Sequence, residues 1–297
     1  MFPRVPKSVI FAKKFRRTIE WHMIARCLVL LSIGVFSSGV LAWNAAGHAA
    51  VAAIADSQLT PAARAQVSGL LLGDLDRQER PSGRKTLMEV ASWADEIRDE
   101  AVKTEPLAYK GWHVRGNQVC SQKLGACREG HCVDELIIRF TAVLADRQQS
   151  SRARNEALKW VVHLVGDLHM PLHSGVNRNG GSARVQMEGV RLKADASFHS
   201  VWDSELLDAA LRGWVRESVT ISKADLPRDA ASRWMIETRD LALREVYEPL
   251  PGFSCQASLP EPIVLDAAYQ QASIAIVRRQ IERAGLRLAQ LLNASLH

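Results

Sequence analysis

Five residues of the types that bind metal ions lie close together in the second half of the chain. His163, Asp167 and His173 belong to the segment His163-Leu-Val-Gly-Asp-Leu-His-Met-Pro-Leu-His173, and His199 and Asp203 follow. Both His-to-Asp pairs have the i to i+4 spacing that places two side chains on one face of a helix. A single such residue is more often a surface or core group, but five within residues 163–203 predict a metal centre.

Three more candidate ligands lie upstream: His48, Asp95 and His113. The full set has three carboxylates and five imidazoles, which are chemically harder metal ligands than cysteine thiolates. Such a set favours catalytic zinc with open coordination positions over a closed structural site. Tryptophans accompany the ligands, and besides their ordinary core role we expect them to fix ligand rotamers. These tryptophans are Trp43, Trp93, Trp112, Trp160 and Trp202.

The elements that must position these residues are predicted to be helices. Apolar residues recur at helical spacing over 47–57, 87–99, 132–149, 151–170 and 267–292. Thr60 and Pro61 are a typical N-cap and first helical residue, and Pro171 should end the helix that carries the first ligand pair. Residues 184–192 are the best strand candidate, with a turn at Glu188-Gly189. We therefore expect a single all-α domain with at most a short β-hairpin.

The first 42 residues differ in composition from the rest. They hold seven of the 38 basic residues and one of the 32 acidic residues. The basic stretch is followed by an apolar run around 28–36 and then by Val40-Leu41-Ala42, with small residues at the cleavage positions. This pattern predicts a signal peptide over 1–42, removed before Trp43, and a secreted or periplasmic domain over 43–297. An uncleaved anchor is the alternative, but the run falls short of the roughly 18 residues of a membrane helix.

Removal of that segment leaves equal numbers of basic and acidic residues. Net charge therefore gives no argument for a basic nucleic-acid-binding surface. Attraction for an anionic substrate would have to come from the metal ions themselves.

The domain keeps two features of exported proteins. Four cysteines remain, which predicts disulfides, and three pairings of them are open. These are Cys120, Cys127, Cys132 and Cys255. Asn293-Ala-Ser295 is a glycosylation sequon, which is informative only if the source glycosylates its exported proteins.

The motifs together resemble those of the zinc-dependent single-strand nucleases, the mung bean nuclease family, which is related more distantly to bacterial zinc-dependent phospholipase C. The resemblance covers essentially all of 43–297. It rests on five segments in order: Trp43-Asn-Ala-Ala-Gly-His48, Trp93-Ala-Asp95, Trp112-His113, 163–173 and His199-Ser-Val-Trp-Asp203.

The resemblance implies three zinc ions in a helical cleft. By position, one would be held by Asp95, His113, His163 and Asp167. The second would be held by His173, His199 and Asp203. The third would be held by His48, Asp167 and the terminal amine and carbonyl of Trp43, so that Asp167 bridges two ions and processing completes the site. The resemblance also implies the disulfides Cys127–Cys132 and Cys120–Cys255.

The chain departs from the family after His113. Family members commonly have an aromatic residue there and then an aspartate or asparagine near the attacking water, whereas Val114-Arg115-Gly116 follows here. Loss of a stacking ring would weaken binding by about 1–3 kcal/mol per base. We expect Arg115 to bind phosphate directly. Together with the bridging Asp167, it is a candidate catalytic residue. Ser182 also replaces an asparagine often found near the site.

The function implied by the resemblance is hydrolysis of single-stranded DNA and RNA, with 3′-nucleotidase activity, by a monomer without a stable protein partner. A water shared by two zinc ions is the expected nucleophile. One alternative is phospholipase C, although that branch generally has glutamate where this chain has Asp203. Another is a zinc-binding homologue with impaired catalysis, which residues 114–116 favour and the complete ligand set opposes.

Overall fold

The structure is a computed structural model that describes residues 43–297 except 77, 106, 180 and 217–225. The expected signal peptide lies outside the described residues. The described part is mostly helical, with one small sheet, which confirms the all-α expectation. None of its helices combines the length and the apolar composition needed to span a membrane.

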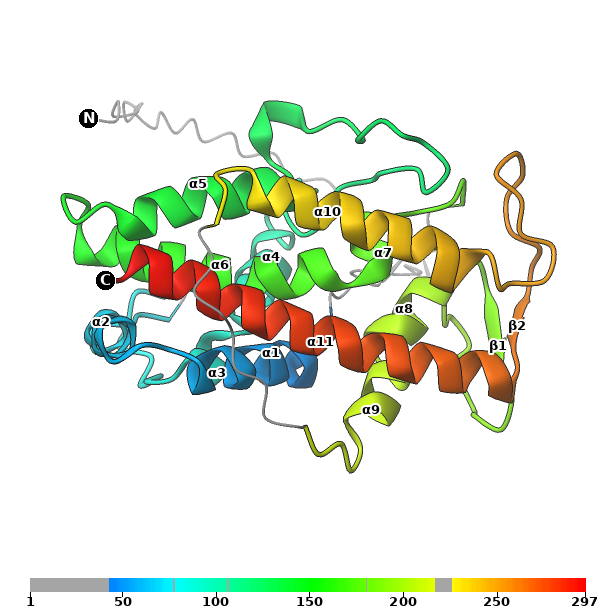
Figure 1. The fold of residues 1–297 in the computed structure, drawn as a ribbon, viewed down its shortest axis with the longest axis horizontal. Coiled ribbons are helices and arrows are strands. Elements are labelled where there is room, and N and C mark those ends of the chain that lie inside the picture. Colours follow the sequence, from blue (N-terminus) through cyan, green and yellow to red (C-terminus); the bar gives the residue numbers. More distant parts are fainter. Residues whose placement is uncertain (1–42, 77, 106, 180, 217–225) are drawn as a thin grey trace, which may run out of the picture. The chain divides into compact units, whose positions relative to one another are not determined.

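Helix α6 (Ser151–His169) is the central element. Ser150 caps it by accepting from the backbone N–H of Ala153, and nearly every residue from 157 to 169 is buried. A helix that is buried on all sides needs neighbours all round. Helix α5 (Val133–Ala145) and the long helix α11 (Ala267–Ser295) pack against it, and Figure 1 shows both running beside it.

Shorter helices pack around this centre. Helix α1 (Ala45–Ser57) lies against α11 and α6, and α10 (Ala230–Leu241), which continues as a π-helical turn over Ala242–Tyr247, packs on α5, α6 and α7. Helix α2 (Pro61–Leu71) begins as expected, because the Thr60 hydroxyl accepts from the N–H of Ala63 and Pro61 is its first residue. Helices α8 (Phe198–Asp203) and α9 (Glu205–Leu211) follow one another almost directly.

The helix expected over 87–99 is divided into α3 (Leu87–Val90) and α4 (Trp93–Ala101). The break at Ala91-Ser92 has a structural use. The Ala91 carbonyl, which lies at this break, accepts a hydrogen bond from Nδ1 of His163 at 2.7 Å. The prediction of one continuous helix was therefore wrong for a reason that lies in the tertiary structure.

Pro171 ends α6 and begins another helix. Helix α6 stops at His169, and Pro171 is the first residue of the one-turn helix α7 (Pro171–Ser174). A proline fits that position because the first N–H of a helix has no partner within it. The new turn carries His173 toward α6.

The expected β-hairpin is corrected by the structure. Strand β1 (Val185–Met187) pairs in parallel with β2 (Ile263–Leu265), in the register Val185 to Ile263. A tight turn does form at Glu188-Gly189, where Gly189 has φ +71° and the N–H of Val190 donates to Met187. The returning segment is too short to form a second strand, so β1 pairs with a distant one.

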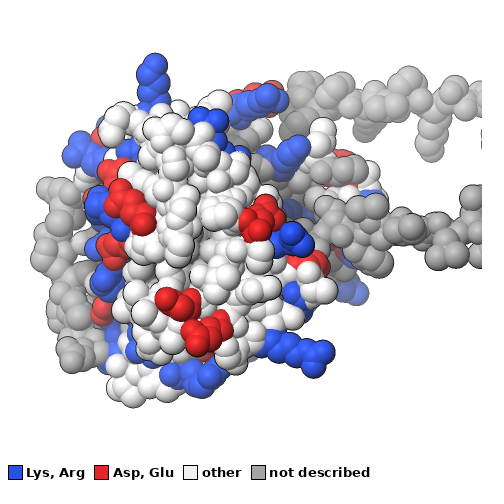
Figure 2. Space-filling model, turned by 90° about the vertical axis from the view of Figure 1, so that its right-hand side faces the viewer, with Lys and Arg blue, Asp and Glu red and all other residues white. Residues whose placement is uncertain are grey.

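Two disulfides, Cys120–Cys255 and Cys127–Cys132, join the loops beside this core. They match the pairings implied by the resemblance. Figure 2 shows basic and acidic side chains interspersed on one face of the molecule, without a continuous basic surface on that face.

Candidate metal centre

The eight predicted ligands, which come from six parts of the chain, lie together inside the helical core. Helix α1 supplies His48, α4 supplies Asp95, α7 supplies His173, and the segment after α4 supplies His113. Helices α6 and α8 supply two ligands each, in the expected i to i+4 pairs. All eight are at most 9% exposed, so substrate must enter a recess to reach them.

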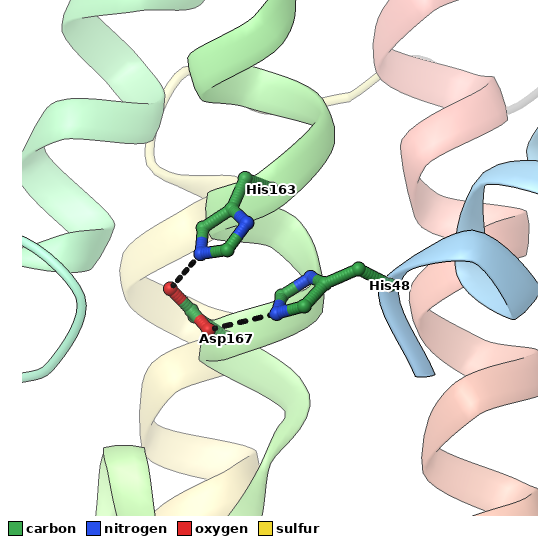
Figure 3. A group of neighbouring side chains, drawn as sticks. All are labelled: His48, His163 and Asp167. Carbon is green, nitrogen blue, oxygen red and sulfur yellow. Dashed lines mark ion pairs between the residues drawn. The ribbon is translucent and has the colours of Figure 1, made fainter. Parts of the chain in front are cut away.

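Asp167 lies at the junction of two ligand groups. Its Oδ2 is 2.9 Å from Nδ1 of His113 and 3.1 Å from Nε2 of His163, whereas its Oδ1 is 3.5 Å from Nε2 of His48. Figure 3 shows His163 and His48 each directed at a different oxygen of this carboxylate. One carboxylate with its two oxygens turned to two groups has the geometry of a bridging ligand.

Three groups of ligand atoms are each compact enough for one metal ion. They are His48, His163 and Asp167; Asp95, His113 and His163; and His173, His199 and Asp203, with all atoms of a group within 4.8 Å of one another. In the last group, Nε2 of His199 is 3.2 Å from Oδ2 of Asp203, and Nε2 of His173 is 3.9 Å from Oδ1. The third group has the same residues as one expected ligand set. The other two differ from the expected sets, because His163 belongs to both and Asp167 is grouped with His48 but not with Asp95 and His113.

The ligand atoms themselves indicate that this centre holds cations. Buried polar atoms normally have hydrogen-bond partners, yet many at this centre have none. The unpartnered atoms are both ring nitrogens of His48, Oδ1 of Asp95, Nε2 of His113, Oδ1 of Asp167, Nε2 of His173, Nε2 of His199 and both carboxylate oxygens of Asp203. Metal ions bound by imidazole and carboxylate groups would satisfy most of them, so the residues fit the expected zinc.

Backbone carbonyls orient two of the imidazoles. Nδ1 of His163 donates to Ala91, and Nδ1 of His173 donates to the carbonyl of His113 at 3.0 Å. With Nδ1 committed to a carbonyl, Nε2 of each ring is the nitrogen that faces the cluster, and in the neutral ring it carries the lone pair. Outer-sphere hydrogen bonds of this kind fix the tautomer of metal-binding histidines.

The electrostatics of the cluster are those of a cation site. Burial opposes a charge on His163, but the carboxylates of Asp167 and Asp95 outweigh it and raise the pKa of His163 to about 10. Burial lowers the pKa of His48 and His199 to about 3, so both imidazoles are neutral and able to ligate. The carboxylates therefore hold a proton on His163, which a metal cation would displace.

Close packing around Gly166 fixes the position of His48. The rings of His48 and His163 stack with centroids 3.9 Å apart. A Cβ on Gly166 would lie 2.8 Å from Nδ1 of His48, so the absence of a side chain makes room for that imidazole. The Gly166 position of α6 is thus dictated by the site.

Trp43 lies beside the site. It is fully buried, and the next residue, Asn44, donates its N–H to the carbonyl of Asp203 at 3.1 Å. The Asn44 side chain caps α1 and donates to Asp208 on α9. These contacts hold Asn44 against α8 and α9.

Arg115 makes a structural ion pair. Its guanidinium pairs with the fully buried Asp134 at 2.5 Å and donates to the carbonyl of Gly125 at 2.9 Å. These contacts occupy the groups with which Arg115 would bind phosphate. The hypothesis that it binds phosphate stays a prediction, and the geometry favours a role in holding the 114–133 segment.

Arg98 is the cation beside the ligands that the sequence reasoning missed. It pairs with Asp95 at 2.7 Å and with Asp99 at 2.8 Å. The i to i+3 spacing from Asp95 on a helix was the available signal. Among the remaining histidines, His169 is buried and accepts a hydrogen bond from Arg287 on α11, and His131 is partly exposed near Cys132.

The fold and the site define a helical protein with a buried centre of histidines and aspartates, the ligand chemistry of hydrolytic metalloenzymes. The family model described as S1/P1 Nuclease matches residues 43–297. Endonuclease 4 of Arabidopsis thaliana is 27% identical over 92% of this chain and 94% of its own. Nuclease P1 of Penicillium citrinum is 25% identical over 84% of this chain and 97% of its own. The chain belongs to the S1/P1 nuclease family, and it is a nuclease, a hydrolase of phosphodiester bonds.

Proposed function

We propose that this nuclease is exported, binds three zinc ions, and hydrolyses single-stranded DNA and RNA as well as the 3′-phosphate of nucleotides. It acts as a monomer without a stable protein partner. The observation that carries the proposal is the bridging position of Asp167 between ligand groups whose buried atoms have no other partners.

The three zinc ions would be held by the ligand sets that the family resemblance implies. These are Asp95, His113, His163 and Asp167; His173, His199 and Asp203; and His48, Asp167 and the amine and carbonyl of Trp43. When bound, such ions supply Lewis acidity and lower the pKa of a water molecule toward 7, which suits phosphodiester hydrolysis.

The burial of the ligands supports a single-stranded substrate. Because they are at most 9% exposed, a scissile phosphate must enter the recess. A single strand can bend its backbone into such a recess, whereas a duplex is stiff over far longer distances. Arg98 lies at the edge of this centre, where its pairing with Asp95 and Asp99 offsets part of the negative charge of the carboxylates.

Cleavage of the signal peptide would complete the third ligand set. The backbone nitrogen of Trp43 is an amine only after processing, and an amide nitrogen is a poor metal ligand. We expect a variant with one residue added before Trp43 to lose one zinc ion and most activity. A fully active variant that binds three zinc ions would refute this step.

The experiment uses protein processed to Trp43 and five substrates: single-stranded DNA, single-stranded RNA, the matching duplex, a 3′-nucleotide and phosphatidylcholine vesicles. We expect zinc-dependent hydrolysis of both single strands and the 3′-nucleotide, with the duplex at least tenfold slower. Asp167→Asn serves as the inactive control. Hydrolysis of phosphatidylcholine alone would support the phospholipase alternative, and no turnover by protein holding three zinc ions would support a binding protein.

A further inference from the structure

A second surface feature lies near the metal centre. A groove with a volume of about 620 Å³ is lined by uncharged polar side chains, including Gln118, Ser121 and Ser258, and by the disulfide Cys120–Cys255. Arg178 is the one charged residue among the described residues that line it. The described lining of the groove therefore carries one positive charge, that of Arg178, on an otherwise uncharged surface.

A parallel pair of chain segments leads from the metal centre to this groove. The ligands His113 and His173 are joined by the hydrogen bond from Nδ1 of His173 to the carbonyl of His113. Further along, the N–H of Val176 donates to Asn117 at 2.8 Å and the N–H of Val119 donates to Val176 at 3.0 Å. Both segments thus leave the centre side by side and in the same direction.

The length of this connection sets an upper limit to the distance between the metal centre and the groove. Arg178 is five residues beyond His173. Five residues span at most about 18 Å when fully extended. Arg178 therefore lies within about 18 Å of the centre, a distance that a strand of a few nucleotides can cover.

The groove is held in shape before any strand binds. The disulfide ties the segment that contains Cys120 to the loop that contains Cys255. Nδ2 of the buried Asn177 donates to the carbonyl of Ala257 at 3.3 Å, which joins the same two walls a second time. Little conformational entropy would be lost on binding to a surface that is already ordered.

Arg178 is available for an anionic ligand. Its side chain is exposed, and no carboxylate in the part of the chain that the structure describes pairs with it. Arg115, by contrast, is bound to Asp134. A free guanidinium can bind a phosphate through two parallel hydrogen bonds.

We infer that this groove is a subsite for single-stranded nucleic acid in which Arg178 binds the phosphate of a nucleotide that flanks the scissile bond. This inference rests on the proposed function. The uncharged polar walls would contact sugars and bases without a strong sequence preference. The subsite would make the enzyme favour polynucleotides over mononucleotides, because a mononucleotide occupies the metal centre alone.

The test compares an eight-nucleotide single strand with a 3′-nucleotide, at several salt concentrations, for wild type, Arg178→Ala and Arg178→Lys. Arg191→Ala is the matched control, because Arg191 is also exposed but does not line the groove. For Arg178→Ala we expect about fivefold lower kcat/KM on the strand, and a slope of log KM against log salt lower by about 0.7, the value for one phosphate contact. Hydrolysis of the 3′-nucleotide should be unchanged, Arg178→Lys should keep the salt slope, and Arg191→Ala should match wild type.

An Arg178→Ala enzyme with wild-type kinetics on the strand, or with equal losses on both substrates, would overturn the inference. If wild type hydrolyses neither substrate, the proposed function fails, and the groove is then tested by equilibrium binding of the labelled strand. Weaker binding by Arg178→Ala but not by Arg191→Ala would support the subsite, and equal binding by all three proteins would overturn it.

Discussion

Replacement of Gly166 by alanine should damage the metal centre while leaving the fold in place. The new Cβ would lie 2.8 Å from Nδ1 and 3.1 Å from Cε1 of His48, whereas ordinary contacts begin at 3.4 Å. The imidazole, which is fully buried and stacked on His163, must therefore move by about 0.6 Å to relieve the overpacking. Metal-ligand distances tolerate deviations of only about 0.2 Å.

The expected loss of folding stability is small, whereas the expected loss of zinc affinity is large. Alanine in place of glycine stabilises a helix by about 1 kcal/mol, and overpacking of a core costs about 1–3 kcal/mol. The free energy of unfolding of the metal-free protein should therefore fall by no more than about 2 kcal/mol. Zinc affinity at the group that contains His48 should fall by about 10–100-fold, the range found when the support of a metal ligand is disturbed.

The assay combines urea unfolding of metal-free protein with calorimetric zinc titration. Gly69→Ala is the matched control, because Gly69 also lies in a helix and its added Cβ would meet nothing within 4 Å. The control should bind zinc as wild type does. A Gly166→Ala protein that binds zinc with wild-type affinity and stoichiometry would refute the argument that the absence of a side chain at this position makes room for His48.

Three further predictions concern stability. Gly285→Ala would place a Cβ 2.5 Å from Ile54 across the α1–α11 contact, so urea unfolding should show a loss of about 1–3 kcal/mol, and Ile54→Ala in the same protein should recover part of it. Removal of Cys120–Cys255, which spans 135 residues, should lower the unfolding free energy by about 5 kcal/mol in the chain-entropy model. Removal of Cys127–Cys132, which spans 5 residues, should lower it by about 2 kcal/mol. Equal losses for the two variants in thermal unfolding would contradict that model for this protein. The side chain of Asn293 donates to the carbonyl of Gln58 and accepts from the N–H of Thr60. Mass spectrometry of protein from a glycosylating host should therefore find this sequon unmodified, and Asn293→Ala should lower the unfolding free energy by about 1–3 kcal/mol. A glycan on Asn293 would be incompatible with these hydrogen bonds.

The residues that share a helix were predictable from spacing alone. His163 with Asp167 and His199 with Asp203 form the i to i+4 pairs expected of them, because helical geometry fixes which neighbours share a face. The N-cap at Thr60 followed from local chemistry in the same way. Such features depend on a few adjacent residues, so the sequence carries them directly.

Long-range features were beyond this kind of reasoning. Spacing could not show that His48, from the first helix, contacts Asp167 in α6, and only the family resemblance implied it. The break between α3 and α4 frees a carbonyl that accepts from His163, and the partner of β1 is strand β2, far along the chain. The pairing of Arg115 with Asp134 likewise depends on how α5 packs. In each case the outcome is set by tertiary packing rather than by local preference.

The most direct test of the account is a zinc titration of metal-free protein processed to Trp43, with bound zinc and hydrolysis of single-stranded DNA measured in the same samples. Because Asp167 joins two of the ligand groups, activity should be absent without zinc and should reach its maximum only as three zinc ions bind per chain. Asp167→Asn should bind fewer ions and stay inactive at any zinc concentration. Full activity with a single bound zinc ion, or undiminished activity after complete chelation, would contradict the account.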